Sequence, residues 1–318
     1  MSQRPGDQVT PHCDDTIDGV ETVIIPRARD LGGFEVRRAL PAPKRQMVGP
    51  FIFFDQMGPA ELLTSEGISV RPHPHTGLST VTYLFEGEIR HRDSLGTDQA
   101  IQPGAVNWMV AGKGIAHSER MTEASKGKQT MDMHGIQTWV ALPLEHEHTA
   151  PAFEHHTRQA LPVIEDDGIR ARLILGSAFG ERAPVTVHSE MFYMDVVLEP
   201  GATCPLPDDH EDRGAYIVEG EVEIAGQRFD KGRMMVFRPG DAMSMRATAR
   251  GARVMLLGGA TFPEQRYISW NFVASSREGI RQAKLDWMDR QNKRFIMPPG
   301  DTEEFIPLPE AEQPKGRR

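Results

Sequence analysis

The sequence predicts an all-β protein of two similar antiparallel β-barrels followed by one helix, and three observations indicate this class. Short runs of β-branched and aromatic residues alternate with turn residues along most of its 318 residues, which is typical of sandwiches and barrels. A weak internal repeat relates the two halves: Glu86-Gly-Glu88 is matched by Glu219-Gly-Glu221, and Gly104-x7-Gly112 by Gly232-x7-Gly240. One segment, 275–295, has clear helical periodicity.

The first half of the chain contains the runs that should build the first barrel. Residues 1–18 are polar and rich in Pro, Asp and Gln, so we expect a disordered leader, with the first barrel spanning residues 19–145. Turn clusters containing glycine separate the runs, since glycine adopts positive φ at little cost. The expected strands are 21–25, 34–38, 48–54, 80–90 with a bend at 86–88, 106–110 and 136–142.

A change in composition marks the connection to the second half. Residues 146–168 are rich in Pro, Glu and His, so we expect a linker there and a second barrel over 169–308. Ser275 and Glu278 have the spacing of a capping box at the start of the helix, and a frayed tail should follow at 309–318. The strands expected in this half are 169–175, 191–198, 215–218, 222–224, 234–237 and 253–257.

Composition and charge exclude several classes of protein. An apolar content of 39% and a charged content of 25% are typical of a soluble globular protein. The net charge of −9 argues against a direct nucleic-acid partner, which would require a cationic face. We expect a monomer.

Cysteine usage and hydropathy indicate where the protein resides. Cys13 and Cys204 are the only cysteines, which suits a reducing compartment. The leader lacks the apolar region of a signal peptide, and no apolar run reaches 18 residues. We therefore expect a cytoplasmic protein without a membrane partner.

Two stretches carry the residues expected to bind a metal. His73 and His75 are two positions apart, and so are His117 and Glu119. Because residues i and i+2 of a strand share one face, two adjacent strands would direct three imidazoles and one carboxylate at a common point. Such ligands suit divalent iron, nickel, manganese, copper or zinc, and the spacing does not choose among them.

Two other pairs of residues have the spacing of metal ligands, and each has an ordinary structural explanation. His91 and Asp93 also have ligand spacing, but flanking Arg90 and Arg92 favour an exposed strand end. His146 and His148 repeat the His-x-His spacing in a polar stretch that favours a solvated loop.

Three further residues have side chains that admit a role at or near a site. His134 and Gln137 could orient a metal ligand through a hydrogen bond, or could form an ordinary buried polar pair. Cys204 precedes a proline and has no base nearby in the sequence, so we do not expect a nucleophile.

The internal repeat predicts that the second barrel binds no metal. The same offsets place Met245 and Ala247 where His117 and Glu119 stand, and Leu206 and Asp208 where the first histidine pair stands. Only His188 and His210 occur after residue 168, and neither has a His-x-His partner.

Longer motifs resemble a known family. The Gly67-x5-His73-x-His75 and Gly112-x-Gly114-x2-His117 patterns resemble the two cupin motifs, with glycine where the second usually has proline. More specifically, the chain resembles the pirin family over roughly residues 20–309. The stretches that carry this resemblance are His73-Pro-His-Thr-Gly77, Thr80-Val-Thr-Tyr-Leu84, Glu86-Gly-Glu88, His91-Arg-Asp-Ser-Leu-Gly96, Ala111-Gly-Lys-Gly-Ile115 and His117-Ser-Glu119.

The resemblance implies a bicupin, with two stacked barrels and one mononuclear metal in the first. It places the metal ligands at His73, His75, His117 and Glu119, with iron as the usual occupant. Ser79 and Thr80 stand where many cupins have a glutamate, so the surroundings of the ligands should differ.

The resemblance also implies two alternative functions. The first is a metal-dependent dioxygenase that opens a flavonol such as quercetin with O₂, with Glu119 as general base. The second is a metal- or redox-dependent regulatory protein that acts through a protein partner. A metal that only stabilises the barrel is a third reading, and an open coordination position would separate the enzyme from it.

Overall fold

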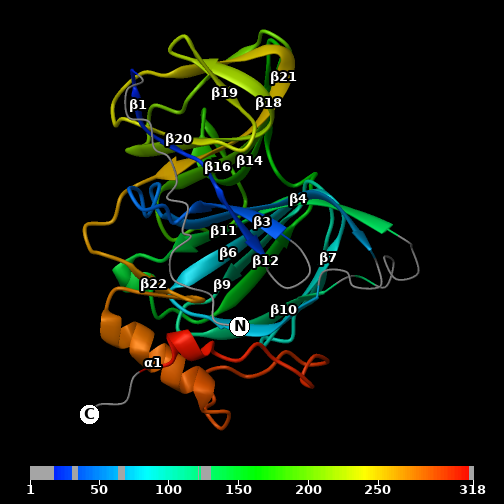
Figure 1. The fold of residues 1–318 in the computed structure, drawn as a ribbon, viewed down its shortest axis with the longest axis vertical. Coiled ribbons are helices and arrows are strands. Elements are labelled where there is room, and N and C mark those ends of the chain that lie inside the picture. Colours follow the sequence, from blue (N-terminus) through cyan, green and yellow to red (C-terminus); the bar gives the residue numbers. More distant parts are fainter. Residues whose placement is uncertain (1–17, 31–34, 64–68, 121, 123–129, 315–318) are drawn as a thin grey trace, which may run out of the picture.

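The computed structural model describes residues 18–30, 35–63, 69–120, 122 and 130–314. Nearly all of the leader, including Cys13, and the last four residues of the predicted tail lie outside these ranges. The described chain forms antiparallel sheets with one α-helix, which confirms the predicted all-β bicupin class (Figure 1).

The N-terminal barrel consists of a small and a large sheet. In the order of pairing, the small sheet contains β5 (Ser69–His75), β10 (Ile115–Arg120), β7 (Ile89–Asp93) and β8 (Asp98–Ile101). The large sheet contains β12 (Ala152–His156), β9 (Val106–Val110), β6 (Leu78–Glu86), β11 (Thr130–Ala141), β4 (Phe51–Leu63), β3 (Glu35–Leu40) and β2 (Arg27–Asp30).

The C-terminal barrel is formed by a ten-stranded sheet. Its main path contains β1 (Val20–Ile24), β20 (Met234–Phe237), β18 (Asp212–Ile224), β21 (Ser244–Gly259), β16 (Met191–Leu198), β14 (Ile169–Ala178) and β13 (Val163–Asp166). The side strands are β15 (Glu181–Arg182), β17 (Thr203–Pro205) and β19 (Gln227–Asp230).

Both ends of the described chain cross to the opposite barrel, which the predicted boundaries did not anticipate. Strand β1 pairs with β20, and its Val20 and Val23 lie in the apolar core of the C-terminal barrel. In return, β22 (Tyr267–Ser269), β23 (Phe272–Ala274) and α1 (Arg277–Met288) pack against the N-terminal barrel, where they share an apolar cluster with Ala116 of β10. Figure 1 shows α1 beyond the N-terminal barrel, on the side away from the C-terminal one.

The predicted helix boundaries are wrong at both ends. Helix α1 covers Arg277–Met288 rather than 275–295, and Ser276 caps it by accepting a hydrogen bond from the N–H of Gly279. Ser275, the predicted cap, lies one residue before the N-cap, and its N–H donates to the carboxylate of Glu147.

The linker and the tail also contain regular structure. Residues 146–168 include β12, which pairs with β9, and β13, which pairs with β14. Within the tail, η3 (Glu310–Glu312) is held by an ion pair between Glu312 and Lys284 of α1. Each segment is ordered by long-range contacts that local composition does not reveal.

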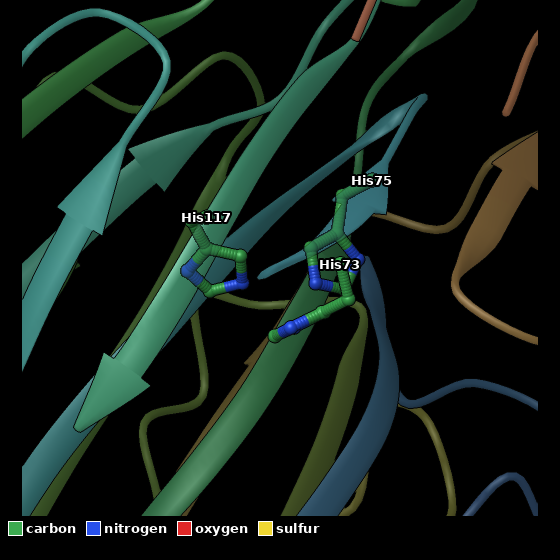
Figure 2. Close-up of side chains that lie close together, drawn as sticks. All are labelled: His73, His75 and His117. Atoms are coloured by element: carbon green, nitrogen blue, oxygen red, sulfur yellow. The ribbon is translucent and has the colours of Figure 1, made fainter. Parts of the chain in front are cut away.

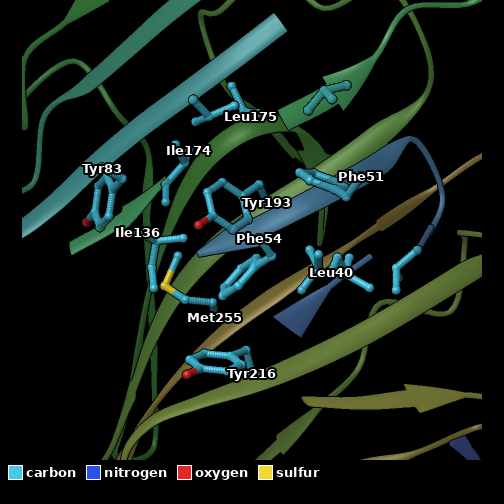
Figure 3. Close-up of a cluster of buried hydrophobic side chains, with 14 of the residues drawn as sticks. Leu40, Phe51, Phe54, Tyr83, Ile136, Ile174, Leu175, Tyr193, Tyr216 and Met255 are labelled. Carbon is cyan, nitrogen blue, oxygen red and sulfur yellow. The ribbon is translucent and has the colours of Figure 1, made fainter. Parts of the chain in front are cut away.

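The two barrels share a hydrophobic core (Figure 3). Leu40, Phe51 and Phe54 of the first barrel meet Tyr193 and Tyr216 of the second within one buried cluster. Phe54 and Tyr216 approach with ring centroids 4.8 Å apart, and Phe51 and Tyr193 with centroids 5.6 Å apart. The large sheet of the N-terminal barrel therefore packs against the ten-stranded sheet of the C-terminal barrel. The small sheet, with β5 and β10, lies on the far side of the N-terminal barrel.

No helix within the described residues is long and apolar enough to cross a membrane.

Candidate metal centre

Strands β5 and β10 bring three histidines together. The antiparallel register places His117 opposite His73 and Ile115 opposite His75. The ring centroids are separated by 4.4 Å for His73 and His117 and by 5.0 Å for each of the other two pairs. One nitrogen from each ring lies within 4.8 Å of the others, and Figure 2 shows the rings grouped around a common space.

The fourth predicted ligand, Glu119, lies beside this cluster and is not part of it. The β5–β10 register shifts after His117, so that Glu119 faces Val70 and the intervening Arg71 and Pro72 are left unpaired. Proline has no N–H for a ladder hydrogen bond, which favours such a bulge at this point. The Glu119 carboxylate accepts a 2.6 Å hydrogen bond from Nε2 of Gln137 on β11.

Backbone carbonyls orient two of the imidazoles. The Nδ1 of His73 lies 2.9 Å from the carbonyl oxygen of Arg71, and the Nδ1 of His75 lies 3.0 Å from that of Asn271. A carbonyl only accepts, so both Nδ1 atoms carry the proton and both Nε2 atoms retain a lone pair.

The third imidazole has a ring nitrogen that is free to bind a ligand. The Nε2 of His117 is buried and has no hydrogen-bond partner among the described residues. Buried polar atoms are rarely left unpaired. Three imidazoles with available Nε2 lone pairs therefore fit a divalent transition metal, and His73, His75 and His117 are the residues that would hold it.

Burial keeps these histidines neutral. Desolvation lowers the pKa of His73 to about 4 and lowers the pKa of His75 and His117 well below the usual value. Repulsion between the neighbouring imidazoles acts in the same direction for the latter two. Desolvation also raises the pKa of Glu119. At neutral pH the ring nitrogens can thus bind a cation without first losing a proton.

The expectation that His91 and Asp93 lie on the surface is wrong. The two residues are 4% and 0% exposed, and β7 pairs Asp93 with His117 and His91 with Glu119. Alternation along β7 explains the error, because Arg90 and Arg92 point outward to Asp98 while His91 and Asp93 point inward.

A cavity of about 580 Å³ adjoins the histidine cluster. His73 and Glu119 line one part of it, and Phe53, Trp139 and Trp270 supply aromatic surface. Trp139 stacks on Phe53 with centroids 3.9 Å apart and meets the His75 ring edge-on at 5.0 Å. Aromatic walls with a few polar groups are typical of small-molecule sites.

Arginines make one side of this cavity cationic. Arg38 forms a bidentate salt bridge with Asp55, which neutralises its charge. Arg27 lies nearby. Burial lowers the pKa of its guanidinium, and repulsion from Arg29 and Arg38 lowers it further. Neither Arg27 nor Arg29 has an ion-pair partner among the described residues, so this side favours a ligand with negative charge.

Sequence reasoning missed the contribution of the C-terminal segment to this site. The turn between β22 and β23 places Trp270 and Asn271 at the cavity, and Asn271 supplies the carbonyl that orients His75. Trp270 has a φ of 52°, in the left-handed region that residues other than glycine rarely adopt. Asn271 is nearly 200 residues from β5 along the chain, so its contact with the site leaves no pattern in the sequence around the histidines.

The remaining candidates lie apart from the cluster. Gln137 contacts Glu119, but His134 lies between the barrels, 3.0 Å from Gln56 and 3.6 Å from Glu219. His146 packs edge-on against His188, and His148 is exposed.

The positions equivalent to the site in the second barrel are mostly apolar. Met245, Ala247 and Leu206 belong to its buried apolar core, beside Cys204, whose pKa burial raises to about 12. Asp208 is exposed. A raised thiol pKa agrees with the expectation that Cys204 is not a nucleophile.

Fold and site together define a bicupin with a buried three-histidine cluster in its N-terminal barrel. The pirin family model matches residues 33–140, and the model of the pirin C-terminal cupin domain matches residues 193–293. A pirin-like protein of Caulobacter vibrioides is 49% identical over 294 residues, which cover 92% of this chain and all of that protein. The chain belongs to the pirin family.

Two other relatives have names that refer to an activity. A Pseudomonas aeruginosa protein, provisionally named a quercetin 2,3-dioxygenase, is 38% identical over 83% of this chain and 82% of its own length. The crystal structure of a quercetin 2,3-dioxygenase from Acinetobacter baumannii superposes with a TM-score of 0.83 at 31% identity, over 93% of this chain and 96% of that one.

Proposed function

We propose that the protein is a metal-dependent dioxygenase that opens a flavonol such as quercetin with O₂. One observation carries the proposal: the unpartnered Nε2 of buried His117 lies in a histidine cluster that adjoins a 580 Å³ cavity. Structural metal sites are closed by protein ligands, whereas this cluster borders space for an organic molecule. The names of the Pseudomonas and Acinetobacter relatives support the choice of substrate.

His73, His75 and His117 would hold the metal, with Glu119 as a fourth ligand if its carboxylate turns from Gln137. A metal bound there would act as a Lewis acid and template for the flavonol and O₂. Iron is our first choice, and the imidazole set also suits nickel, manganese, copper or zinc.

The residues around the cavity have distinct roles in this proposal. Phe53, Trp139 and Trp270 would bind the flat rings of the flavonol. Glu119 would accept the proton of the flavonol hydroxyl, because burial raises its pKa and makes it a stronger base. Gln137 holds the carboxylate in place, and the charges of Arg27 and Arg29 favour the resulting flavonolate.

Aerobic assays of the metal-loaded protein test the proposal. The protein is stripped of metal, reconstituted separately with Fe, Ni, Mn, Cu or Zn, and mixed with quercetin while the flavonol absorbance is followed. We expect loss of absorbance that requires both metal and O₂, with the metal-free protein and an anaerobic sample as controls. No turnover with several flavonols and every metal would overturn the enzyme and favour a regulatory protein that binds a protein partner.

A further inference from the structure

The geometry points to Asp93 and His91 as positioning residues that fix the tautomer of His117 and so keep its Nε2 available to the metal. The inference rests on the metal site that the proposed function requires, but not on flavonol oxidation. It assigns a role to two residues of β7 that do not line the cavity and do not belong to the histidine cluster.

Three side chains form a hydrogen-bonded chain that ends at the ligand atom. The Oδ2 of Asp93 lies 3.0 Å from the Nε2 of His91. The Nδ1 of His91 lies 3.3 Å from the Nδ1 of His117, whose Nε2 is the unpartnered atom of the cluster. All three residues are buried, at 0%, 4% and 1% exposure, so these hydrogen bonds are shielded from bulk solvent.

The donors and acceptors can be assigned from the carboxylate outward. Oδ1 of Asp93 accepts from the N–H groups of Leu95 at 2.9 Å and Thr97 at 3.2 Å. The carboxylate is thus the acceptor, and His91 must donate through Nε2–H.

With one proton on each ring, the Nδ1 of His91 is left with a lone pair and accepts from Nδ1–H of His117. That second assignment leaves the lone pair of His117 on Nε2, the atom directed at the cluster. All three ligand histidines then present Nε2, although two are oriented by backbone carbonyls and only His117 by side chains.

The variant Asp93→Asn should reverse the donor and acceptor roles along these hydrogen bonds, while the side chain at position 93 keeps nearly the same size and shape. Two backbone N–H groups face one atom of the side chain, so the amide oxygen should stay with Leu95 and Thr97 and the NH₂ group should face His91. His91 must then accept through Nε2 and donate through Nδ1. His117 in turn must accept through Nδ1, which places its proton on the ligand atom Nε2.

Two measurements on the metal-free and zinc-titrated protein test the inference. Imidazole ¹⁵N NMR of histidine-labelled apo protein, with His117 assigned by its loss in His117→Gln, should show the proton on Nδ1 in the wild type and on Nε2 in Asp93→Asn. Competitive titration with Zn²⁺ should show affinity reduced about 10- to 100-fold, the usual cost of removing the partner of a ligand histidine. Asp98→Asn, on the neighbouring strand and outside the chain of bonds, is the matched control and should bind zinc as the wild type does.

A second variant keeps the test decisive if Asp93→Asn does not fold. His91→Phe preserves the stacking of this ring on Phe153, with centroids 4.6 Å apart, but removes the acceptor for His117. Zinc affinity should fall by a similar factor, while His155→Phe, in the same barrel and hydrogen-bonded to Asn107, should leave it unchanged.

Wild-type zinc affinity in His91→Phe, or an unchanged His117 tautomer in folded Asp93→Asn, would overturn the inference. Neither readout involves a flavonol, so a failure here is distinct from a failure of the proposed activity.

Discussion

His75 and Asn271 are 196 residues apart in the chain, yet the Nδ1 of the histidine lies 3.0 Å from the carbonyl oxygen of the asparagine. The contact links the metal cluster to the segment that returns from the C-terminal barrel. In the same region, the N–H of Ile306 donates to the carbonyl of Pro72, next to His73. The orientation of His75, and the backbone of β5 beside His73, therefore depend on docking of the chain after residue 266.

Loss of that docking should weaken the metal site. Trp287 of α1 is 1% exposed and donates its Nε1–H to the carbonyl of Ile306, so Trp287→Ala should lower the free energy of unfolding by about 3–5 kcal/mol. Hydrogen exchange at residues 268–274 should accelerate, and metal affinity should fall. Met288→Ala, at an adjacent exposed position, is the control and should change stability by less than about 0.5 kcal/mol. Unchanged exchange in Trp287→Ala would show that docking does not depend on this helix.

The variant Glu119→Gln tests whether Glu119 acts as a general base or as a metal ligand. If the carboxylate takes up the flavonol proton, turnover should fall about 10²- to 10⁴-fold while the metal content per chain stays near that of the wild type. Metal analysis and quercetin turnover on the same preparation measure both quantities. Parallel loss of metal and activity would identify Glu119 as a simple ligand.

The apo protein should lose stability as the pH falls from about 6.5 towards 4. Burial lowers the pKa of His73 to about 4, so the unfolded chain binds a proton in this range that the folded chain does not. For this one residue, the difference between the pKa values of the unfolded and folded states corresponds to about 3 kcal/mol in the free energy of unfolding. Urea unfolding at several pH values gives the free energy of unfolding as a function of pH. This free energy should change less steeply with pH in His73→Gln than in the wild type. Equal slopes in the two proteins would contradict a neutral, buried His73.

Arg27→Gln should weaken binding of the flavonolate. Arg27 has no ion-pair partner among the described residues, so its charge is available to the ligand. Its removal should raise KM on the order of tenfold with a smaller effect on kcat, because the charge stabilises the ground-state complex as well as the transition state. The effect should shrink at high ionic strength. Arg37→Gln, at an exposed position on the opposite face of β3, is the control. Equal KM values in Arg27→Gln and the wild type would exclude an electrostatic role for Arg27.

The sequence allowed prediction of the class of fold and of the three clustered histidines, because strand alternation is a local rule. The same rule applied to His91 and Asp93, but the charged neighbours Arg90 and Arg92 outweighed it in the interpretation. The pattern buried, half-exposed, buried along β7 shows that these arginines mark the outer face of a strand whose inner face reaches the site.

What could not be predicted depends on contacts that are distant in sequence. The crossing of β1 to the C-terminal barrel and the docking of α1 on the N-terminal one leave no local pattern, since each buries an ordinary apolar face. The position of Glu119 depends on a register shift at Pro72, which alternation alone does not reveal.

One metal ion should bind between His73, His75 and His117. Anomalous diffraction from crystals of the zinc-reconstituted protein tests it most directly. We predict one strong peak per chain in the N-terminal barrel, about 2.0–2.1 Å from the Nε2 atom of each histidine. A peak elsewhere, or coordination that omits any of the three histidines, would contradict this account.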